Sequence, residues 1–364
     1  MNHGWEIRPL QDICNKASSN LMQKNIDSEN GKYPVFGASG IAGYIDYYVQ
    51  AKDYIGIIKD GSGVGRVSVY PKESSLLGTL QYIIPNENMD LRYVAYALKS
   101  MNLAKYVSGA AIPHIYFRDY GEEKIAVPSI KTQSKVADEL DKLNELIEIK
   151  RNQIKDLDAL AQSLFNETFS SIGETVPLSF YVNALVGGKS LASKEVSPNK
   201  VLKSGAVTYD YFDKNSTKYL PVDYTPDAEH SVSTGDLIIS RMNTAELVGA
   251  CAYVFDVDDN VYLPDRLWRI EYKSNANPIY LWKSLISESA KWQIRSKASG
   301  TSGSMKNISK PLLLSINIKK VPISIQQQFA ERIEAIEAQK KRVEASIADL
   351  ETLLASRMDY WFND

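Results

Sequence analysis

The sequence has very little of the chemistry on which metal sites and covalent scaffolds depend. Its 364 residues include two cysteines, Cys14 and Cys251, and three histidines. Two cysteines without a pairing pattern exclude a disulfide scaffold, and we interpret both as reduced thiols. The histidines, His3, His114 and His230, stand far apart without flanking cysteines, which argues against a zinc or other metal site.

Long apolar runs and a charge excess are also absent. No apolar run approaches the roughly 18 residues that a membrane-spanning helix needs. The N-terminal residues lack the apolar core of a secretory signal, so we expect a cytoplasmic protein. With 42 basic and 44 acidic residues the net charge is −2, which gives no global sign of nucleic-acid binding. Apolar residues at 44% are typical of a globular protein with room for several domains.

Two stretches of the chain have the composition of long helices. Residues 133–169 and 326–362 each run for 37 residues without glycine or proline, enough for about 55 Å of helix. Their apolar residues recur in a 4-3 heptad, which is the pattern of a coiled coil. The predicted seam consists of Val136, Leu140, Leu143, Ile147, Ile154, Leu157 and Leu164 in the first helix and Phe329, Ile333, Ile336, Val343, Ile347, Leu350 and Leu354 in the second.

One lysine stands near the middle of each predicted seam, Lys150 in the first helix and Lys340 in the second. A polar residue at such a position can set the register of two paired helices. The alternative is that each ammonium extends off the edge of the seam into water.

The helical stretches belong to a tandem duplication. Each residue of the second stretch lies 193 positions after its counterpart in the first (326 − 133). Similar strand, turn and helix segments precede both. The sequence therefore predicts an α+β protein with pseudo-two-fold symmetry, in which two mixed α/β domains are joined by two long antiparallel helices forming a coiled coil. We expect globular domains at residues 1–130 and 171–324, and helices at 131–170 and 325–364.

Each globular domain contains a tract in which basic residues outnumber acidic ones. Residues 283–310 hold six lysines and arginines against Glu288 alone, and residues 92–118 hold four with no acid. Tyrosine and tryptophan residues lie beside them. Local basic strips with aromatic neighbours suit contact with a phosphate backbone.

Several short motifs occur in matching order in the two halves of the chain. They are the domain starts GWEIRPLQDIC and GETVPLSFYV, the turns KDGSGVG and SRMNTAELVG, and two Val-Pro segments that precede helices, the second followed by Gln326-x-x-Phe329-Ala330-x-x-Ile333. The first half also contains the segment YPVFGASGIAGYID. With this ordered set, nearly the whole chain resembles the specificity subunit of type I restriction–modification enzymes.

The resemblance implies a DNA-recognition subunit without chemistry of its own. The two globular domains are then target recognition domains, each reading one half of a bipartite double-stranded DNA target. The helices are then the regions that set the spacer and dock two methyltransferase subunits, with restriction/translocase subunits joining the assembly. S-adenosylmethionine, ATP and Mg are expected on those partner subunits and no cofactor on this chain.

Residues that contact bases need donors and acceptors on loops, with glycines where backbone must approach closely. The candidates in the first domain are Ser39, Gly40, Lys59, Asp60, Ser62, Arg66, Lys105, His114 and Tyr116. Those in the second are Lys189, Ser190, Tyr209, Tyr211, Ser240, Arg241, Asn243, Thr244, Lys297, Ser302, Lys306 and Asn307. Arg241 and Asn243 are the sharpest, because arginine pairs well with guanine and asparagine with adenine.

Each assignment has a structural alternative. Arg241 would instead pair with an acid or a phosphate, and Asp60 would cap its turn. The tyrosines would pack in the core, and His114 would be structural.

Two motifs suggest catalysis but are incomplete. Asn277-Pro-Ile-Tyr280 lacks the second proline of the motif with which amino-methyltransferases hold a flipped adenine. Asp265 and Glu271 with Lys273 imitate a metal nuclease signature with too short a spacing. A self-sufficient nuclease or methyltransferase is therefore disfavoured. A coiled-coil scaffold for protein partners, without DNA specificity, remains the main alternative function.

Overall fold

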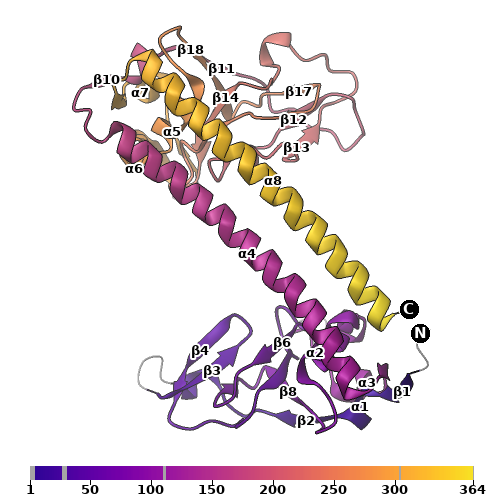
Figure 1. The fold of residues 1–364 in the computed structure, drawn as a ribbon. Helices are drawn as coiled ribbons and strands as arrows, with labels where there is room; N and C mark the ends of the chain where they lie inside the picture. Colours follow the sequence, from indigo (N-terminus) through magenta and orange to yellow (C-terminus); the bar gives the residue numbers. More distant parts are fainter. Residues whose placement is uncertain (1–4, 27–30, 110–111, 303–304, 364) are drawn as a thin grey trace. The chain divides into compact units, whose positions relative to one another are not determined.

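The computed structural model describes residues 5–26, 31–109, 112–302 and 305–363 (Figure 1). The chain forms two compact units, residues 1–153 with 343–364 and residues 154–342. Two 40-residue helices, α4 (Ile130–Phe169) and α8 (Ile323–Phe362), run through both units. Each unit therefore combines one globular domain with part of each long helix, so the helices do not form compact units of their own.

The first globular domain is built on a four-stranded antiparallel sheet in the order β2-β8-β5-β6. A second sheet has the order β4-β3-β7, with β3 parallel to β7, and β1 pairs with β9. The elements are β1 (Glu6–Pro9), α1 (Leu10–Ile13), β2 (Cys14–Ser18), η1 (Gln23–Asn25), β3 (Tyr33–Gly37), β4 (Gly40–Ile45), β5 (Tyr54–Ile58), β6 (Val67–Tyr70), β7 (Ser75–Leu76), β8 (Leu80–Pro85), α2 (Leu91–Ser100), η2 (Leu103–Tyr106), α3 (Phe117–Tyr120) and β9 (Lys124–Val127).

The second globular domain repeats this topology. Its main sheet has the order β11-β18-β14-β16, its second sheet the order β13-β12-β17 with β12 parallel to β17, and β10 pairs with β21. It also has a three-stranded sheet, β15-β20-β19. The elements are β10 (Thr175–Pro177), η3 (Leu178–Phe180), β11 (Val182–Gly187), β12 (Lys200–Leu202), η4 (Ser204–Val207), β13 (Thr217–Tyr219), η5 (Ala228–His230), β14 (Leu237–Ser240), β15 (Met242–Asn243), β16 (Cys251–Tyr253), β17 (Val261–Tyr262), β18 (Leu267–Tyr272), α5 (Pro278–Leu285), α6 (Glu288–Lys297), β19 (Ser299–Ser302), β20 (Met305–Asn307), α7 (Lys310–Leu314) and β21 (Asn317–Lys319).

The central strands β5 and β14 are buried along their whole length. A strand covered on both faces reads as a continuous apolar run, and YIGII and LIIS have that character. In the first domain α2 packs on β5, and in the second α5 packs on β14. Both cysteines are free and buried. Burial raises the pKa of the Cys14 thiol to about 12 and that of Cys251 well above its ordinary value.

The two long helices run antiparallel within each unit. In the first unit Arg357 pairs with Glu139, and twelve residues further along α4 Arg151 pairs with Glu351 at 2.8 Å. Residues nearer the C-terminus of α4 thus pair with residues nearer the N-terminus of α8, as in an antiparallel pair. In the second unit Lys340 pairs with Asp158 at 2.6 Å, and Phe165 contacts Phe329.

All fourteen residues of the predicted seam are buried or half-buried. Val136 and Leu140 share a cluster with Leu354, and Leu157 and Leu164 pack against a core that contains Phe329. Lys340 lies at the helix contact, where its ammonium bonds both Asp158 and Glu337.

The predicted fold class is confirmed. Two mixed α/β domains of matching topology occur in tandem, with two long helices that pair antiparallel in each unit. Among the described residues, no helix is long and apolar enough to cross a membrane.

Candidate nucleic-acid interface

Two of the loops chosen from sequence meet at the end of β5 in the first domain. The chain leaves this strand at Lys59 and turns at Gly61, whose φ of 84° favours glycine. The N–H of Gly61 donates to the carbonyl of Pro113 at 2.8 Å, and the N–H of Ile115 donates to that of Lys59 at 2.9 Å. An isolated bridge pairs Asp60 with His114. The 59–66 turn and the 112–116 segment therefore form one surface.

The β3–β4 turn joins the same surface through Arg66. Its guanidinium donates to the carbonyl of Ala38, next to the exposed Ser39 and Gly40. Gly40 has a φ of 117°, and a Cβ there would meet no atom within 4 Å, so glycine serves the backbone conformation and leaves the turn open. Ser62 is also exposed. We call these three segments, 38–40, 59–66 and 112–116, the first recognition surface.

The aromatic edge of this surface is formed by Tyr116. The Arg118 guanidinium lies 4.7 Å from its ring centroid, and the ring of His114 meets it edge-on at 4.8 Å. His114 is half-buried and its backbone pairs with Ser108, which fits the structural role weighed for it. Tyr116 is exposed, contrary to the core-packing alternative.

Lys105 is committed to an internal ion pair. Its ammonium bonds the carboxylate of Glu123, which also accepts from the hydroxyl of Tyr106. The hydrogen bond from Lys105 holds the pKa of Glu123 below its usual range. Because its charge is already matched, Lys105 is a weaker candidate for a DNA contact than its place in a basic tract indicated.

In the second domain the corresponding surface is a small sheet. β15 follows directly after β14 and pairs with β20, so Met242 lies opposite Asn307 and Asn243 opposite Lys306. β19 pairs with the other edge of β20. The segments 240–244 and 297–307 were chosen from sequence, and the described parts of both are therefore brought together. Residues 303–304 and the side chain of Ser302 lie outside the described residues.

Arg241 and Asn307 hold two unpartnered polar atoms on this sheet. The Nε of Arg241 and the Oδ1 of Asn307 are buried and have no hydrogen-bond partner among the described residues. The Arg241 guanidinium carbon lies 5.5 Å from the centroid of the Trp268 ring. No ion pair between Arg241 and an acid occurs in the described part of the chain, contrary to one alternative weighed above. A buried donor and a buried acceptor without partners favour a ligand that completes them.

The neighbouring polar candidates, Ser240, Asn243 and Thr244, differ in how far their side chains can reach a bound DNA. Ser240 is fully buried and its hydroxyl points to the carbonyl of Met242, so this side chain is not at the surface. Periodicity could not show this, because Ser240 ends a strand that is buried on both faces. The Asn243 Oδ1 accepts from the N–H of Thr244 at 2.9 Å, which shapes the turn and leaves its amide nitrogen free of that bond. Thr244 is exposed.

The segment that contains Lys189 and Ser190 contacts the same loop before β18 that the backbone of Arg241 contacts. The N–H of Gly188 donates to the carbonyl of Pro264 at 3.0 Å, and the N–H of Arg241 donates to that of Arg266 at 3.0 Å. Ser190 bonds the carboxylate of Asp265. Asp265 of the incomplete nuclease motif thus stabilises a loop through Ser190. Among the described residues, no group of three histidine, cysteine, aspartate or glutamate residues could hold a metal ion.

The remaining basic candidates lie along the hairpin. Lys297 ends α6, and the Lys306 ammonium donates to the carbonyl of Gly300 at 3.1 Å. Together, residues 188–190, 241–244, 299–302 and 305–307 form what we call the second recognition surface.

Tyr209 and Tyr211 form an exposed stacked pair. Their side chains are 73% and 56% exposed, and their rings lie 6.2 Å apart at an interplanar angle of 17°. The core-packing alternative is therefore wrong for both. Asp210 between them adopts a left-handed φ of 64°. Its carboxylate accepts from the N–H of Cys251 and pairs with Lys291, so the turn is anchored from beneath.

Trp292 is an exposed residue that our sequence reasoning did not select. It is 70% exposed on α6, directly after Lys291, which bonds Asp210. A tryptophan in the basic tract 283–310 was visible in the sequence, but only the packing of Ala290 and Ile294 on the core decides which face of the helix is outside.

The two recognition surfaces are equivalent in construction. Each is made by the residues that follow the central strand and by the segment that precedes the C-terminal strand of the domain. His114 and Asn307, 193 positions apart, occupy the same place: each pairs with the segment after the central strand and with a segment a few residues upstream. The duplication thus gives each unit one such surface.

Comparison with known proteins agrees with this arrangement. The family model of the type I restriction modification DNA specificity domain matches residues 2–159 and 188–352. The MjaVIII type I restriction enzyme specificity subunit of Methanocaldococcus jannaschii is 25% identical over 372 residues, covering 92% of this chain and 86% of the relative. The EcoprrI specificity subunit of Escherichia coli is 28% identical over 146 residues, covering 39% of this chain and 35% of the relative.

Solved structures share the fold. The S subunit of a type I restriction–modification system from M. genitalium has a TM-score of 0.64 at 18% identity, covering 100% of this chain and 97% of that one. A chain from a study of complex assembly and conformational transition of the type I R-M system has a TM-score of 0.57 at 14% identity, with 98% and 97% covered. The present chain belongs to the type I restriction–modification DNA specificity family and is a DNA-recognition subunit without enzymatic function of its own.

Proposed function

We propose that each recognition surface reads one half of a bipartite target on double-stranded DNA. The observation that carries this proposal is the repetition of one loop arrangement, once per unit, at the end of a rigid central strand. Loops on a rigid scaffold are where recognition residues concentrate. A duplicated protein with two such surfaces suits a target with two separated half-sites. The paired helices set the length of the spacer that is not read.

Arg241 and Asn307 are the proposed base-reading pair of the second surface. An arginine offers paired donors to guanine, and an asparagine offers a donor and an acceptor to adenine. Their unpartnered Nε and Oδ1 atoms are groups that a base edge or an ordered water completes on binding. Asn243 and Thr244 extend the same edge. In the first surface Lys59 and Tyr116 face the DNA, and Arg66 holds the turn.

The methyltransferase subunits dock on the outer faces of the long helices. Leu160 and Leu353 are exposed, lie off the seam and are 193 positions apart, so the duplication presents the same apolar position once in each unit. Leu146 and Ile149 add exposed apolar surface to α4. Apolar side chains on an otherwise polar helix face favour a helical partner. Two equivalent positions favour two methyltransferase copies.

Chemistry then belongs to the partners. The methyltransferase copies hold S-adenosylmethionine and flip one adenine in each half-site, and the restriction/translocase subunits use ATP and Mg. Such an assembly works on chromosomal DNA, and we place it in the cytoplasm.

Methylation mapping tests the proposal. The gene is expressed with its neighbouring methyltransferase gene, and DNA is sequenced by a method that detects methyladenine, with a strain lacking the gene as control. We expect a methylated bipartite motif that vanishes in the control. A purified complex with methyltransferase that ignores DNA sequence would instead favour the coiled-coil scaffold.

A further inference from the structure

Each unit contains the same buried contact between its globular domain and the start of a long helix. Asp90 and Asn277 are the N-cap residues of α2 and α5. The Asp90 carboxylate accepts from the N–H groups of Arg92 and Tyr93 at 2.9 and 3.2 Å. The Asn277 side chain accepts from the second and third N–H groups of α5 at 2.9 and 3.3 Å. Each cap leaves its own N–H pointing away from the helix that it starts.

A buried glutamine accepts that N–H in both units. Gln133 and Gln326 are 1% and 0% exposed and lie in the first turn of α4 and α8. Gln133 Oε1 accepts from the N–H of Asp90 at 2.9 Å, and its Nε2 donates to the carbonyl of Pro128 at 2.9 Å.

Gln326 repeats these bonds. Its Oε1 accepts from the N–H of Asn277 at 2.8 Å, and its Nε2 donates to the carbonyls of Val321 and Asn275 at 2.8 and 3.1 Å. In both units the glutamine Nε2 donates to the carbonyl of the residue five positions before it, Pro128 or Val321.

A buried tyrosine completes the contact. The hydroxyls of Tyr93 and Tyr280 donate to the carbonyls of Ala126 and Lys319 at 2.7 and 2.5 Å. Ala126 and Lys319 are 193 positions apart, as are Gln133 and Gln326. Burial raises the pKa of both hydroxyls, so each remains a donor. We call Asp90, Tyr93 and Gln133, with Asn277, Tyr280 and Gln326, the two glutamine clamps.

Only a carboxamide suits this position. Its oxygen meets an N–H and its nitrogen meets a carbonyl, so a glutamate would place a second oxygen against a carbonyl oxygen. Methionine, of similar length, would leave a buried N–H and a buried carbonyl unpaired, which destabilises the contact between the globular domain and the long helix.

The clamps are connected to the recognition surfaces through rigid elements. α2 packs on β5, β6 and β8, and α5 packs on β14 and β16. β5 leads directly to Lys59 and β14 to Arg241. A rotation of α2 or α5 on its long helix would therefore carry the recognition loops with it.

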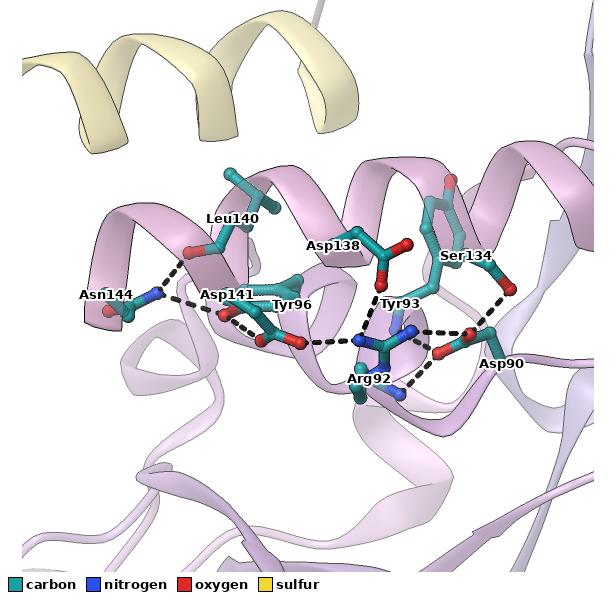
Figure 2. A network of polar contacts seen from close by, with 9 residues as sticks. All are labelled: Asp90, Arg92, Tyr93, Tyr96, Ser134, Asp138, Leu140, Asp141 and Asn144. Carbon is teal, nitrogen blue, oxygen red and sulfur yellow. Dashed lines mark hydrogen bonds and ion pairs between the residues drawn. The ribbon is translucent and has the colours of Figure 1, made fainter. Parts of the chain in front are cut away.

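Around the first clamp a polar network adds further bonds between α2 and α4 (Figure 2). Arg92 bonds Asp138 at 2.8 Å and Asp141 at 2.7 Å, and Asp141 and Asn144 both bond the Tyr96 hydroxyl. In the second unit α5 and α8 are joined by the ion pair of Lys283 with Glu337 at 3.6 Å. The network differs between the units, whereas the clamp does not.

We infer that Gln133 and Gln326 are positioning residues that hold each recognition surface at a set orientation on its long helix, and thereby restrict the spacer length that the protein accepts. This inference rests on the proposed function. It assigns spacer selectivity to two buried side chains as well as to the length of the helices.

The test uses the full chain in complex with its methyltransferase and DNA substrates with constant half-sites and spacers of varied length. The variants are Gln133→Met and Gln326→Met, and Gln327→Met, an exposed neighbour, is the matched control. The measured quantity is the ratio of methylation at the preferred spacer to that at spacers one base pair longer or shorter. We expect this ratio to fall about tenfold in either clamp variant, with the half-site sequences retained and the control unchanged.

An unchanged spacer ratio with normal methylation of the preferred site would overturn the inference. Should a methionine variant fail to assemble, Tyr93→Phe and Tyr280→Phe remove one hydroxyl from each clamp; the same ratio must fall, by a smaller factor. A wild-type complex without any bipartite target would contradict the proposed function instead, so the two failures are distinguishable.

Discussion

Arg357 on α8 holds both carboxylate oxygens of Glu139 on α4. Its Nε bonds Oε1 and its Nη2 donates to Oε2 at 3.2 Å, while the Trp361 indole donates to Oε2 at 3.2 Å. The hydrogen bond from Arg357 keeps the pKa of Glu139 below its usual range. Since the folded pKa is depressed, the pair stabilises the protein above the ordinary glutamate pKa, and the contribution is lost as the pH falls through the folded value.

Glu139→Gln should therefore destabilise the protein at pH 7 by about 1 kcal/mol or less, as is typical of partly exposed pairs. The difference in unfolding free energy from the wild type should shrink as the pH drops below the ordinary glutamate range. Denaturant unfolding between pH 3 and 7 measures it. A difference that stays constant over this range would mean that the carboxylate charge is unimportant.

Arg241→Ala should relax sequence preference at one position of one half-site, at a cost of about 1–3 kcal/mol. The reason is that a guanidinium with an unpartnered Nε over Trp268 offers donors in a fixed orientation. Binding of the methyltransferase complex to single-base variants of the target measures the effect. Arg332→Ala, on the exposed face of α8, is the control. Equal loss on every sequence would make Arg241 a phosphate contact.

Removal of one heptad from both helices should shorten the spacer and leave both half-sites unchanged. The segments 150–156 and 343–349 are equivalent in the duplication, so deleting both keeps the seam in register. Seven residues span about 10.5 Å of helix, equal to about three base pairs of duplex. Methylation mapping of the shortened protein gives the new motif. The same spacer as in the wild type would contradict the proposal that the helices set its length.

Leu160→Glu and Leu353→Glu should each remove one methyltransferase copy. A buried, unpaired carboxylate at the centre of an apolar contact is costly, so the affected copy should bind at least about tenfold more weakly. Native mass spectrometry of the complex counts the copies. Gln162→Glu and Ala355→Glu, two residues further along each helix and on a different face, are matched controls. Two copies bound to the double variant would place the docking surface elsewhere.

The periodic features were predictable from the sequence. The heptad seam follows from side chains repeating at 3.5 residues, and the matching sheet orders follow from the repeat of 193 positions. Loop clustering was also predictable in part, because both recognition surfaces collect segments that lie at strand ends and contain glycine or polar residues.

Pairings between distant residues could not be read from the chain. Lys105 meets Glu123 through the packing of η2 on α3, and Ser240 is covered by strands on both sides. Gln133 and Gln326 looked like polar residues at a helix start. Their burial depends on Asp90 and Asn277, more than forty positions earlier, which a periodic pattern does not report.

The division of the chain into units has a consequence for biosynthesis. Met358 and Phe362 pack on Tyr93 and Val136, so the first unit is completed by a segment that the ribosome makes after the whole second globular domain. The second unit ends at residue 342. During translation the later-encoded half can therefore finish folding first, while the apolar side of the first half of α4 waits for its partner and is exposed to aggregation or to chaperones.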